Sequence, residues 1–118
     1  MPQRPYEKLI VWQEAFKLTL WVYQITKKFP ADERFGVISQ MRRSASSVPM
    51  NIAEGNVKRS AREKAHFLET ALASLEELHC QFRIALGLSY VTQQEFDEAD
   101  GRIHRISYLL NKLRSSIL

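Results

Sequence analysis

The sequence predicts an all-α fold: a single domain over residues 1–118 that forms an antiparallel, up-down-up-down four-helix bundle. Three observations predict it. Apolar residues recur every three or four positions along four long segments, which is the spacing of one helix face. The 118 residues include only four Gly and four Pro, too few for the frequent turns of a β-sandwich or barrel. The links between the segments are short, and short links between long helices place successive helices side by side and antiparallel.

The first predicted helix covers residues 6–29 and ends before Pro30, because proline cannot continue a helix. Leu18, Trp21 and Ile25 form an apolar stripe beside a broader apolar face. So wide an apolar surface predicts contact with two neighbours, and we expect the aromatic residues of the broader face to lie in the core. That face consists of Trp12, Ala15, Phe16, Thr19, Val22, Tyr23, Thr26 and Phe29.

The second predicted helix begins near Asp32 and Glu33, since negative charge is favoured at the positive end of a helix dipole. Gly55 is placed to end it in a left-handed cap. Pro49 lies inside the pattern, removes one backbone donor and crowds the carbonyl of Ala45, so we expect a kink or a loosened turn near Pro49. The apolar face of this helix consists of Phe35, Ile38, Met41, Ala45, Val48 and Ile52.

Two capping boxes mark the starts of the third and fourth predicted helices. Ser60 with Glu63, and Thr92 with Glu95, stand three residues apart, so each pair can satisfy free backbone amides at a helix start. Gly87 ends the third pattern. The third helix has an apolar face of Phe67, Leu68, Ala71, Leu75, Leu78, Phe82, Ala85 and Leu86. The fourth has an uninterrupted seam of Phe96, Ala99, Ile103, Ile106, Leu110, Leu113 and Ile117.

Enzyme chemistry finds little support in the sequence. Two Glu-x-x-His motifs, at residues 63–66 and 76–79, are typical of bundles with a metal centre, but both fall on one predicted helix. Their separation of thirteen residues is about 20 Å along that helix and about 220° around it, so they cannot share a metal ion. Cys80 is a lone helical cysteine, which more often fills apolar space than acts as a nucleophile. We therefore expect no catalytic residue, no metal and no cofactor.

Charge carries the one positive signal of function. A formal net charge of +4 and a pI near 9.4 suit binding to RNA or DNA, which neutralises phosphates and releases counterions. For Arg42, a structural ion pair with Glu54 or with a glutamate of the third helix competes with phosphate binding. For the residues from Lys58 to Lys64, the alternative is a solvated loop. The candidate contact residues are Arg42, Arg43, Lys58, Arg59, Arg62 and Lys64.

Several motifs resemble those of one known family. They are VWQEA at residues 11–15, ERFG at 33–36, QMRRSA at 40–45 and SVPMNIAEG at 47–55. Together they are similar to the bacterial four-helix bundle proteins encoded by intervening sequences inside 23S rRNA genes. The resemblance implies a four-helix protomer and a homopentameric ring. It also implies kinship with the accessory proteins of diversity-generating retroelements, basic pentamers that bind nucleic acid and a reverse transcriptase, and it implies no enzymatic activity.

The sequence therefore favours a non-catalytic protein that binds RNA or DNA as a homo-oligomer. The alternative is a protein-interaction scaffold, or an accessory subunit for a nucleic-acid enzyme such as a reverse transcriptase. A metal-dependent bundle enzyme is a third hypothesis, which bound iron or manganese would support.

Two further expectations concern the surroundings of the chain. The wide apolar surface of the first helix, together with surface from the second or third helix, predicts a subunit contact. Trp21 and Tyr6 lie off the main seam and are candidates for it, because Trp and Tyr are enriched at interfaces. No apolar run reaches the roughly 18 residues that span a bilayer, and no signal-peptide apolar segment follows residues 1–5. We expect a soluble, cytoplasmic protein with no membrane partner.

Overall fold

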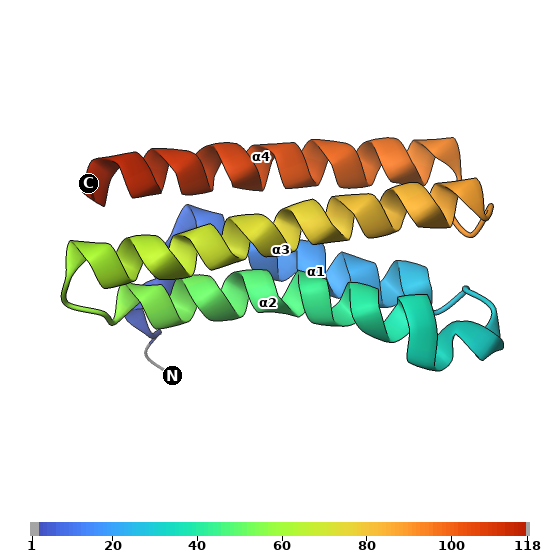
Figure 1. The fold of residues 1–118 in the computed structure, drawn as a ribbon, viewed down its shortest axis with the longest axis horizontal. Helices are drawn as coiled ribbons and strands as arrows, with labels where there is room; N and C mark the ends of the chain where they lie inside the picture. The colour runs from blue at the N-terminus through green and yellow to red at the C-terminus, as the bar shows by residue number, and fades with distance from the viewer. Residues whose placement is uncertain (1–2, 118) are drawn as a thin grey trace.

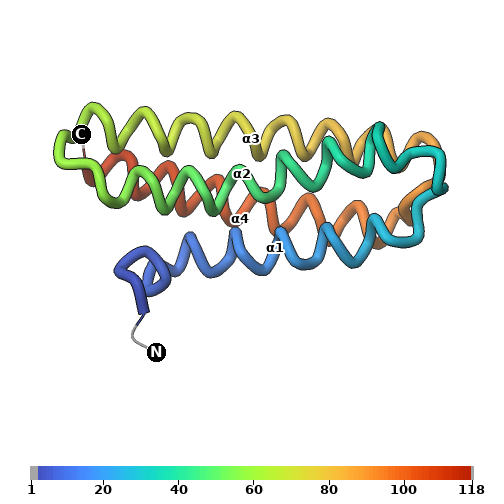
Figure 2. The backbone as a smooth tube through the Cα atoms, turned by 90° about the horizontal axis from the view of Figure 1, so that it is seen from below, coloured from blue at the N-terminus to red at the C-terminus, as the bar shows by residue number. Residues whose placement is uncertain are grey.

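The computed structural model describes residues 3–117 of the chain. Within that range it contains four α-helices and no strand: α1 (Ile10–Thr26), α2 (Ser39–Asn56), α3 (Ala61–Gly87) and α4 (Gln93–Ile117). Successive helices run in opposite directions, and each packs against the two helices beside it (Figure 1, Figure 2). The predicted all-α, up-down-up-down four-helix bundle is confirmed.

The two ends of the bundle are built differently (Figure 1). One end holds the start of α1, the α2–α3 turn and the end of α4, and the other holds the α1–α2 and α3–α4 links. Short 3-10 turns, Pro5–Lys8 and Ala31–Glu33, flank α1, and a π-helical segment, Arg34–Ile38, leads into α2. Because α1 has 17 residues and α3 has 27, α1 is shorter by about 15 Å.

The core runs the length of the bundle as one cluster of buried apolar side chains. In α2, α3 and α4 most residues of the predicted seams are buried, whereas Phe67, Leu86, Leu113 and Ile117 are only partly buried. The structure also buries residues that the seams did not include: Ser44, Pro49, Gly55, Ala65 and Gln81. The capping boxes also form, since the Glu63 amide donates to Ser60 Oγ over 3.0 Å and the Glu95 amide donates to Thr92 Oγ1 over 3.1 Å. Helix starts and seams could therefore be predicted from local sequence.

The aromatic residues of α1 do not all lie in the core as predicted. Phe29 is buried, but Trp12 is half-buried, and Phe16 and Tyr23 keep 43% and 42% of their surface exposed. Trp12 and Phe16 instead stack on each other at the surface, with ring centroids 5.1 Å apart. The neighbouring helices cover only part of the apolar surface of α1. The aliphatic side chains face the core, and several of the bulkier aromatic side chains remain at the surface. The buried residues of α1 are Val11, Ala15, Leu18, Val22, Ile25 and Thr26.

The prediction for the start of the second helix is also wrong. Asp32 and Glu33 lie in the 3-10 turn, and α2 begins only at Ser39. Between them Gly36 has φ −108° and ψ −117°, values that lie outside the helical region and interrupt the register. Phe35, expected in the apolar seam, is consequently 88% exposed.

Gly55 serves packing instead of a left-handed cap. It lies inside α2, and no glycine within residues 3–117 has a positive φ. A Cβ at this position would stand 2.9 Å from the Cβ of Phe67, which is closer than side-chain carbons approach one another. Glycine here lets the backbones of α2 and α3 come close together.

The kink or loosened turn expected near Pro49 does not interrupt α2. The helix runs without interruption from Ser39 to Asn56, and the irregular backbone lies before it, at Gly36. Lacking an N–H group, Pro49 leaves the carbonyl of Ala45 without its donor inside the helix. Thr19 Oγ1 of α1 lies 3.1 Å from the Ala45 carbonyl oxygen and 2.9 Å from the Ala15 carbonyl oxygen of its own helix, so its single O–H is shared between the two acceptors. The missing intrahelical bond is thus partly replaced by a hydrogen bond between two helices.

Candidate nucleic-acid interface

The six predicted contact residues fall into two groups at opposite ends of α2. Arg42 and Arg43 lie in its first turns, whereas the other four surround the turn between α2 and α3. At 1.5 Å per residue, the two groups stand about 20 Å apart along the helix. We call the first group the arginine hollow and the second the α2–α3 junction, which consists of Lys58, Arg59, Arg62 and Lys64.

The arginine hollow is an open surface depression between the end of α1 and the start of α2. Its volume is about 410 Å³, and it includes a third arginine, Arg34 from the π-helical segment. Among residues 3–117, no acidic side chain lines it. Its residues are Tyr23, Arg34, Ile38, Ser39, Arg42, Arg43 and Ser46.

Arg42 is fixed in place by the end of α1. Its Nε donates to Thr26 Oγ1 over 2.9 Å, and its Nη2 donates to the Tyr23 carbonyl oxygen over 3.3 Å. The guanidinium carbon lies 4.7 Å from the centre of the Tyr23 ring. These contacts place the positive charge of Arg42 at the C-terminal end of α1, where the free carbonyl groups favour a cation. The partners are all neutral. The alternative, an ion pair of Arg42 with Glu54 or with a glutamate of α3, does not form within residues 3–117, so the positive charge of Arg42 is not cancelled.

At the α2–α3 junction, two of the four cations are likewise held by neutral groups. Lys64 Nζ donates to the carbonyl oxygen of Asn56 over 3.2 Å, at the end of α2. Lys58 Nζ lies 5.2 Å from the centre of the Phe67 ring. Arg59 and Arg62 are exposed.

Ion pairs in this chain are found elsewhere. Within residues 3–117 the cations that lie within 4 Å of a carboxylate are Lys17, Lys28, Arg102, Arg105 and, when it is protonated, His79. None of the six predicted residues belongs to this set, and neither does Arg34. Between residues 34 and 64 the sequence has seven Lys or Arg and two Glu, a net charge of +5 against +4 for the whole chain.

Arg34 was missed by reasoning from sequence. It forms no ion pair within residues 3–117, and the carboxylate of its neighbour Glu33 accepts a hydrogen bond from Tyr90 Oη over 2.8 Å. That hydrogen bond is the main reason why the pKa of Tyr90 lies above its usual value. A signal was present in the sequence, since no acidic residue occurs between Glu33 and Glu54 while three arginines do.

An apolar groove lies on α1 and α2 between the two basic groups. The half-buried rings of Tyr6 and Trp12 form part of its wall, and Met50 is exposed along it. Its volume is about 230 Å³, and its residues are Tyr6, Trp12, Phe16, Ser46, Pro49, Met50 and Ala53. The surface therefore changes from basic to apolar to basic along α2. Tyr6 lines this groove as an interface candidate, whereas Trp21 stacks on Phe82 with ring centroids 5.7 Å apart.

The histidines do not gather into a metal centre. Within residues 3–117, no group of three or more His, Cys, Asp or Glu side chains is arranged to hold a metal ion. His79 Nε2 lies 2.8 Å from Asp100 Oδ1 and links α3 to α4, and Cys80 is exposed. No helix in the same range is long and apolar enough to cross a membrane.

Comparison with known proteins gives the family. A model of the 23S rRNA-intervening sequence protein family matches residues 7–112. The chain belongs to this family. The intervening sequence protein fold is also found in a solved structure from Bacteroides thetaiotaomicron, described as a protein of unknown function from the S23 ribosomal protein family. The two share 18% sequence identity with a TM-score of 0.82, over 90% of this chain and 96% of the other. Among functionally curated proteins, none matches the chain.

Proposed function

We propose that this intervening sequence protein is a non-catalytic nucleic-acid-binding protein whose binding surface is the basic region of residues 34–64. The observation that carries the proposal is the local excess of charge, seven Lys or Arg against two Glu with no ion pair to any of the seven within residues 3–117. Cations without carboxylate partners are available to neutralise phosphates and to release counterions.

The chemistry of the exposed side chains suits a phosphate backbone. Arg43, Arg59 and Arg62 are exposed, and a guanidinium group can bind a phosphate through two parallel hydrogen bonds. Arg42 uses two of its five N–H groups on α1, so three are left for a ligand. Because the description of the family refers to 23S rRNA, RNA is the first ligand to test.

A salt titration tests this proposal. Filter binding of a structured 23S rRNA hairpin, and of a DNA duplex with the same stem, would be measured from 50 to 300 mM salt. A protomer that engages three to five phosphates should give a slope of log K against log salt of about −2 to −4. Absence of binding at 50 mM salt, or binding that does not depend on salt, would refute the proposal.

We propose further that the protein acts as a homo-oligomer, with a pentamer as the expected form. The apolar groove supports self-association, since neighbouring apolar side chains such as Phe16 and Met50 gain stability when a second copy covers them. A contact there would keep both basic groups at its edges. Five copies of a +4 chain would carry a formal charge of +20 in one particle, which strengthens attraction to a phosphate backbone.

Light scattering at micromolar concentration tests the oligomer. Met50→Glu places a charge in the groove and should dissociate the particle, whereas Ile84→Glu alters an equally exposed apolar residue of α3 outside the groove and should not. A monomer mass for the parent protein, or equal effects of the two substitutions, would refute assembly through the groove.

The apolar groove also favours a second candidate function, a scaffold that binds a protein such as a nucleic-acid enzyme. In that case the groove takes the partner and the basic surface contacts the partner's nucleic acid. This function predicts weak RNA binding by the chain alone and tight co-purification with one protein, which Met50→Glu would abolish.

A further inference from the structure

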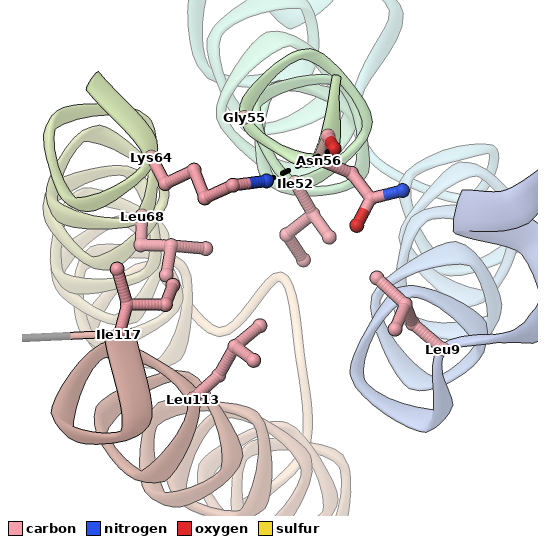
Figure 3. Close-up of a pocket in the computed structure, with 8 residues that line it drawn as sticks. All are labelled: Leu9, Ile52, Gly55, Asn56, Lys64, Leu68, Leu113 and Ile117. Atoms are coloured by element: carbon pink, nitrogen blue, oxygen red, sulfur yellow. Dashed lines mark hydrogen bonds between the residues drawn. The ribbon is translucent and has the colours of Figure 1, made fainter. Parts of the chain in front are cut away.

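A second, smaller cavity opens at the end of the bundle where α2 meets α3, away from the arginine hollow (Figure 3). Its volume is about 170 Å³, close to that of the ~150 Å³ apolar cavities known to bind benzene. Figure 3 shows Leu68, Leu113 and Leu9 projecting into the space between the helices, and the Lys64 side chain extending from α3 to Asn56 on α2. The lining residues are Leu9, Ile52, Gly55, Asn56, Lys64, Leu68, Leu113 and Ile117.

The cavity results from the unequal lengths of the helices. α3 and α4 have 27 and 25 residues, whereas α1 has 17 and begins only at Ile10. The last layer of the bundle therefore lacks a full fourth wall, and on that side the cavity is lined by Leu9, the residue just before α1. Leu113 and Ile117 continue the seam of α4 into this layer but are only partly buried. An apolar ligand that covers these partly exposed side chains removes their apolar surface from water, and this burial favours binding.

The charged groups at the opening of the cavity are all positive. Lys64 Nζ donates one hydrogen bond, to the Asn56 carbonyl oxygen over 3.2 Å, and an ammonium group has three donors. The described part of the chain places no acidic residue in the lining of the cavity. Lys58, Arg59 and Arg62 lie on the adjoining turn and add positive charge.

We propose that this cavity binds a small amphiphile with an apolar body of about six carbons and one carboxylate, the carboxylate being held by Lys64. The apolar body occupies the space between Ile52, Leu68 and Leu113, and the carboxylate accepts a charge-assisted hydrogen bond from Lys64 Nζ at the opening. The site shares Lys64 with the α2–α3 junction, but the exposed arginines and the arginine hollow take no part in it, so hexanoate binding and RNA binding can be tested separately.

Methyl NMR on the full chain tests the site, with hexanoate as the probe and 1-hexanol and hexylammonium as controls of equal length. Hexanoate should shift the methyl signals of Ile52, Leu68, Leu113 and Ile117, with half-saturation at about 0.1–1 mM. Hexanol should bind about tenfold more weakly and hexylammonium more weakly still, because neither offers an anion to Lys64. Equal affinities of hexanoate and hexanol would overturn the proposal, and so would shifts spread over exposed residues such as Val57 and Ile84.

Two substitutions at neighbouring lysines separate the site from general attraction to positive charge. Lys64→Met keeps the length of the side chain and should weaken hexanoate binding about tenfold, while hexanol binding stays the same. Lys58→Met removes the same charge from the same turn and should change hexanoate binding less than twofold. Equal losses in the two variants would overturn the role of Lys64. Leu113→Trp fills the cavity and should abolish binding in a protein that circular dichroism shows to be folded.

Discussion

The basic region of residues 34–64 and helix α4 both carry many charged side chains, but the cations of the two regions have different partners. In α4 four Lys or Arg are matched by four Asp or Glu, and Arg102 and Arg105 bind Glu98 and Glu14 over 2.7 and 2.6 Å. In residues 34–64 the cations that the bundle holds are bound by carbonyl oxygens, a hydroxyl group and aromatic rings. A cation held by a neutral partner is fixed in position but keeps its charge for a ligand.

Substitutions in the two regions should differ most in their effect on RNA binding. Two quadruple variants each remove four positive charges and bring the formal net charge from +4 to zero. The first, R34Q/R43Q/R59Q/R62Q, changes the basic region, and we expect RNA affinity at 50 mM salt to fall about a hundredfold, because up to four phosphate contacts are lost. The second, R102Q/R105Q/K112Q/R114Q, changes α4 and should cost less than about fivefold. Fluorescence anisotropy with one labelled hairpin measures both.

Equal losses in the two quadruple variants would show that only net charge matters and that the basic region has no special role. Far-ultraviolet circular dichroism is the control for folding. The α4 variant also loses exposed ion pairs, which contribute little to stability.

The next effect concerns two adjacent arginines with different surroundings. Arg42→Ala removes hydrogen bonds to Thr26 and to the Tyr23 carbonyl oxygen, so we expect the free energy of unfolding to fall by about 1–3 kcal/mol. Arg43→Ala changes an exposed side chain and should alter it by less than about 0.5 kcal/mol. Urea unfolding measures both values, and similar values for the two variants would contradict the structural role of Arg42.

The sequence was informative about features that depend on nearby residues. The seams of α2, α3 and α4 follow from apolar spacing, and the starts of α3 and α4 follow from Ser60 and Thr92. The prediction failed where local patterns were ambiguous. The α1 segment is apolar on two sides, so spacing could not tell which row of residues would be covered, and Gly36 interrupts a register that the spacing extended to Phe35.

The candidate site was less predictable, because its geometry depends on residues far apart in the chain. The arginines at 42 and 43 were identified from charge, but the partner of Arg42 is Thr26, sixteen residues away on another helix. The spacing of residues on one helix cannot reveal such a contact. The same limit applies to Gly55, whose role depends on the close approach of Phe67 on α3.

A third prediction tests whether neutral hydrogen bonds attach α2 to α1. Thr19→Val removes the hydroxyl that the Ala15 and Ala45 carbonyl oxygens share and leaves the Ala45 carbonyl without a donor, and we expect a loss of about 1 kcal/mol in the free energy of unfolding. In a Pro49→Ala background the new backbone N–H at residue 49 can donate to that carbonyl, so the same substitution should cost less than half as much. Urea unfolding of all four proteins gives the coupling energy, and strictly additive effects would contradict the link between Pro49 and Thr19.

The smallest expected effect is a change of stability with pH, which an ionic contact should show and a contact between neutral groups and Arg42 should not. Partial burial raises the pKa of Glu95, but hydrogen bonds from Lys28 and Thr92 outweigh burial and hold the pKa below its usual value. Since the folded pKa is lowered, the stabilisation is present above the unfolded pKa near 4.5 and is lost as the pH falls through the folded value. Glu95→Gln should therefore be less stable than the parent at pH 7 by a few tenths of a kcal/mol, because the pair is partly exposed.

That difference should vanish as the pH is lowered from 7 to 3, which thermal unfolding at each pH can follow. Glu69→Gln is the matched control, because the exposed Glu69 side chain makes no hydrogen bond or ion pair within residues 3–117. The loss of stability in Arg42→Ala should stay constant over the same range, since Thr26 and the Tyr23 carbonyl do not titrate. A pH-dependent loss for Arg42→Ala would show that a carboxylate partners this arginine, and the contrast between neutral and ionic contacts would then not hold.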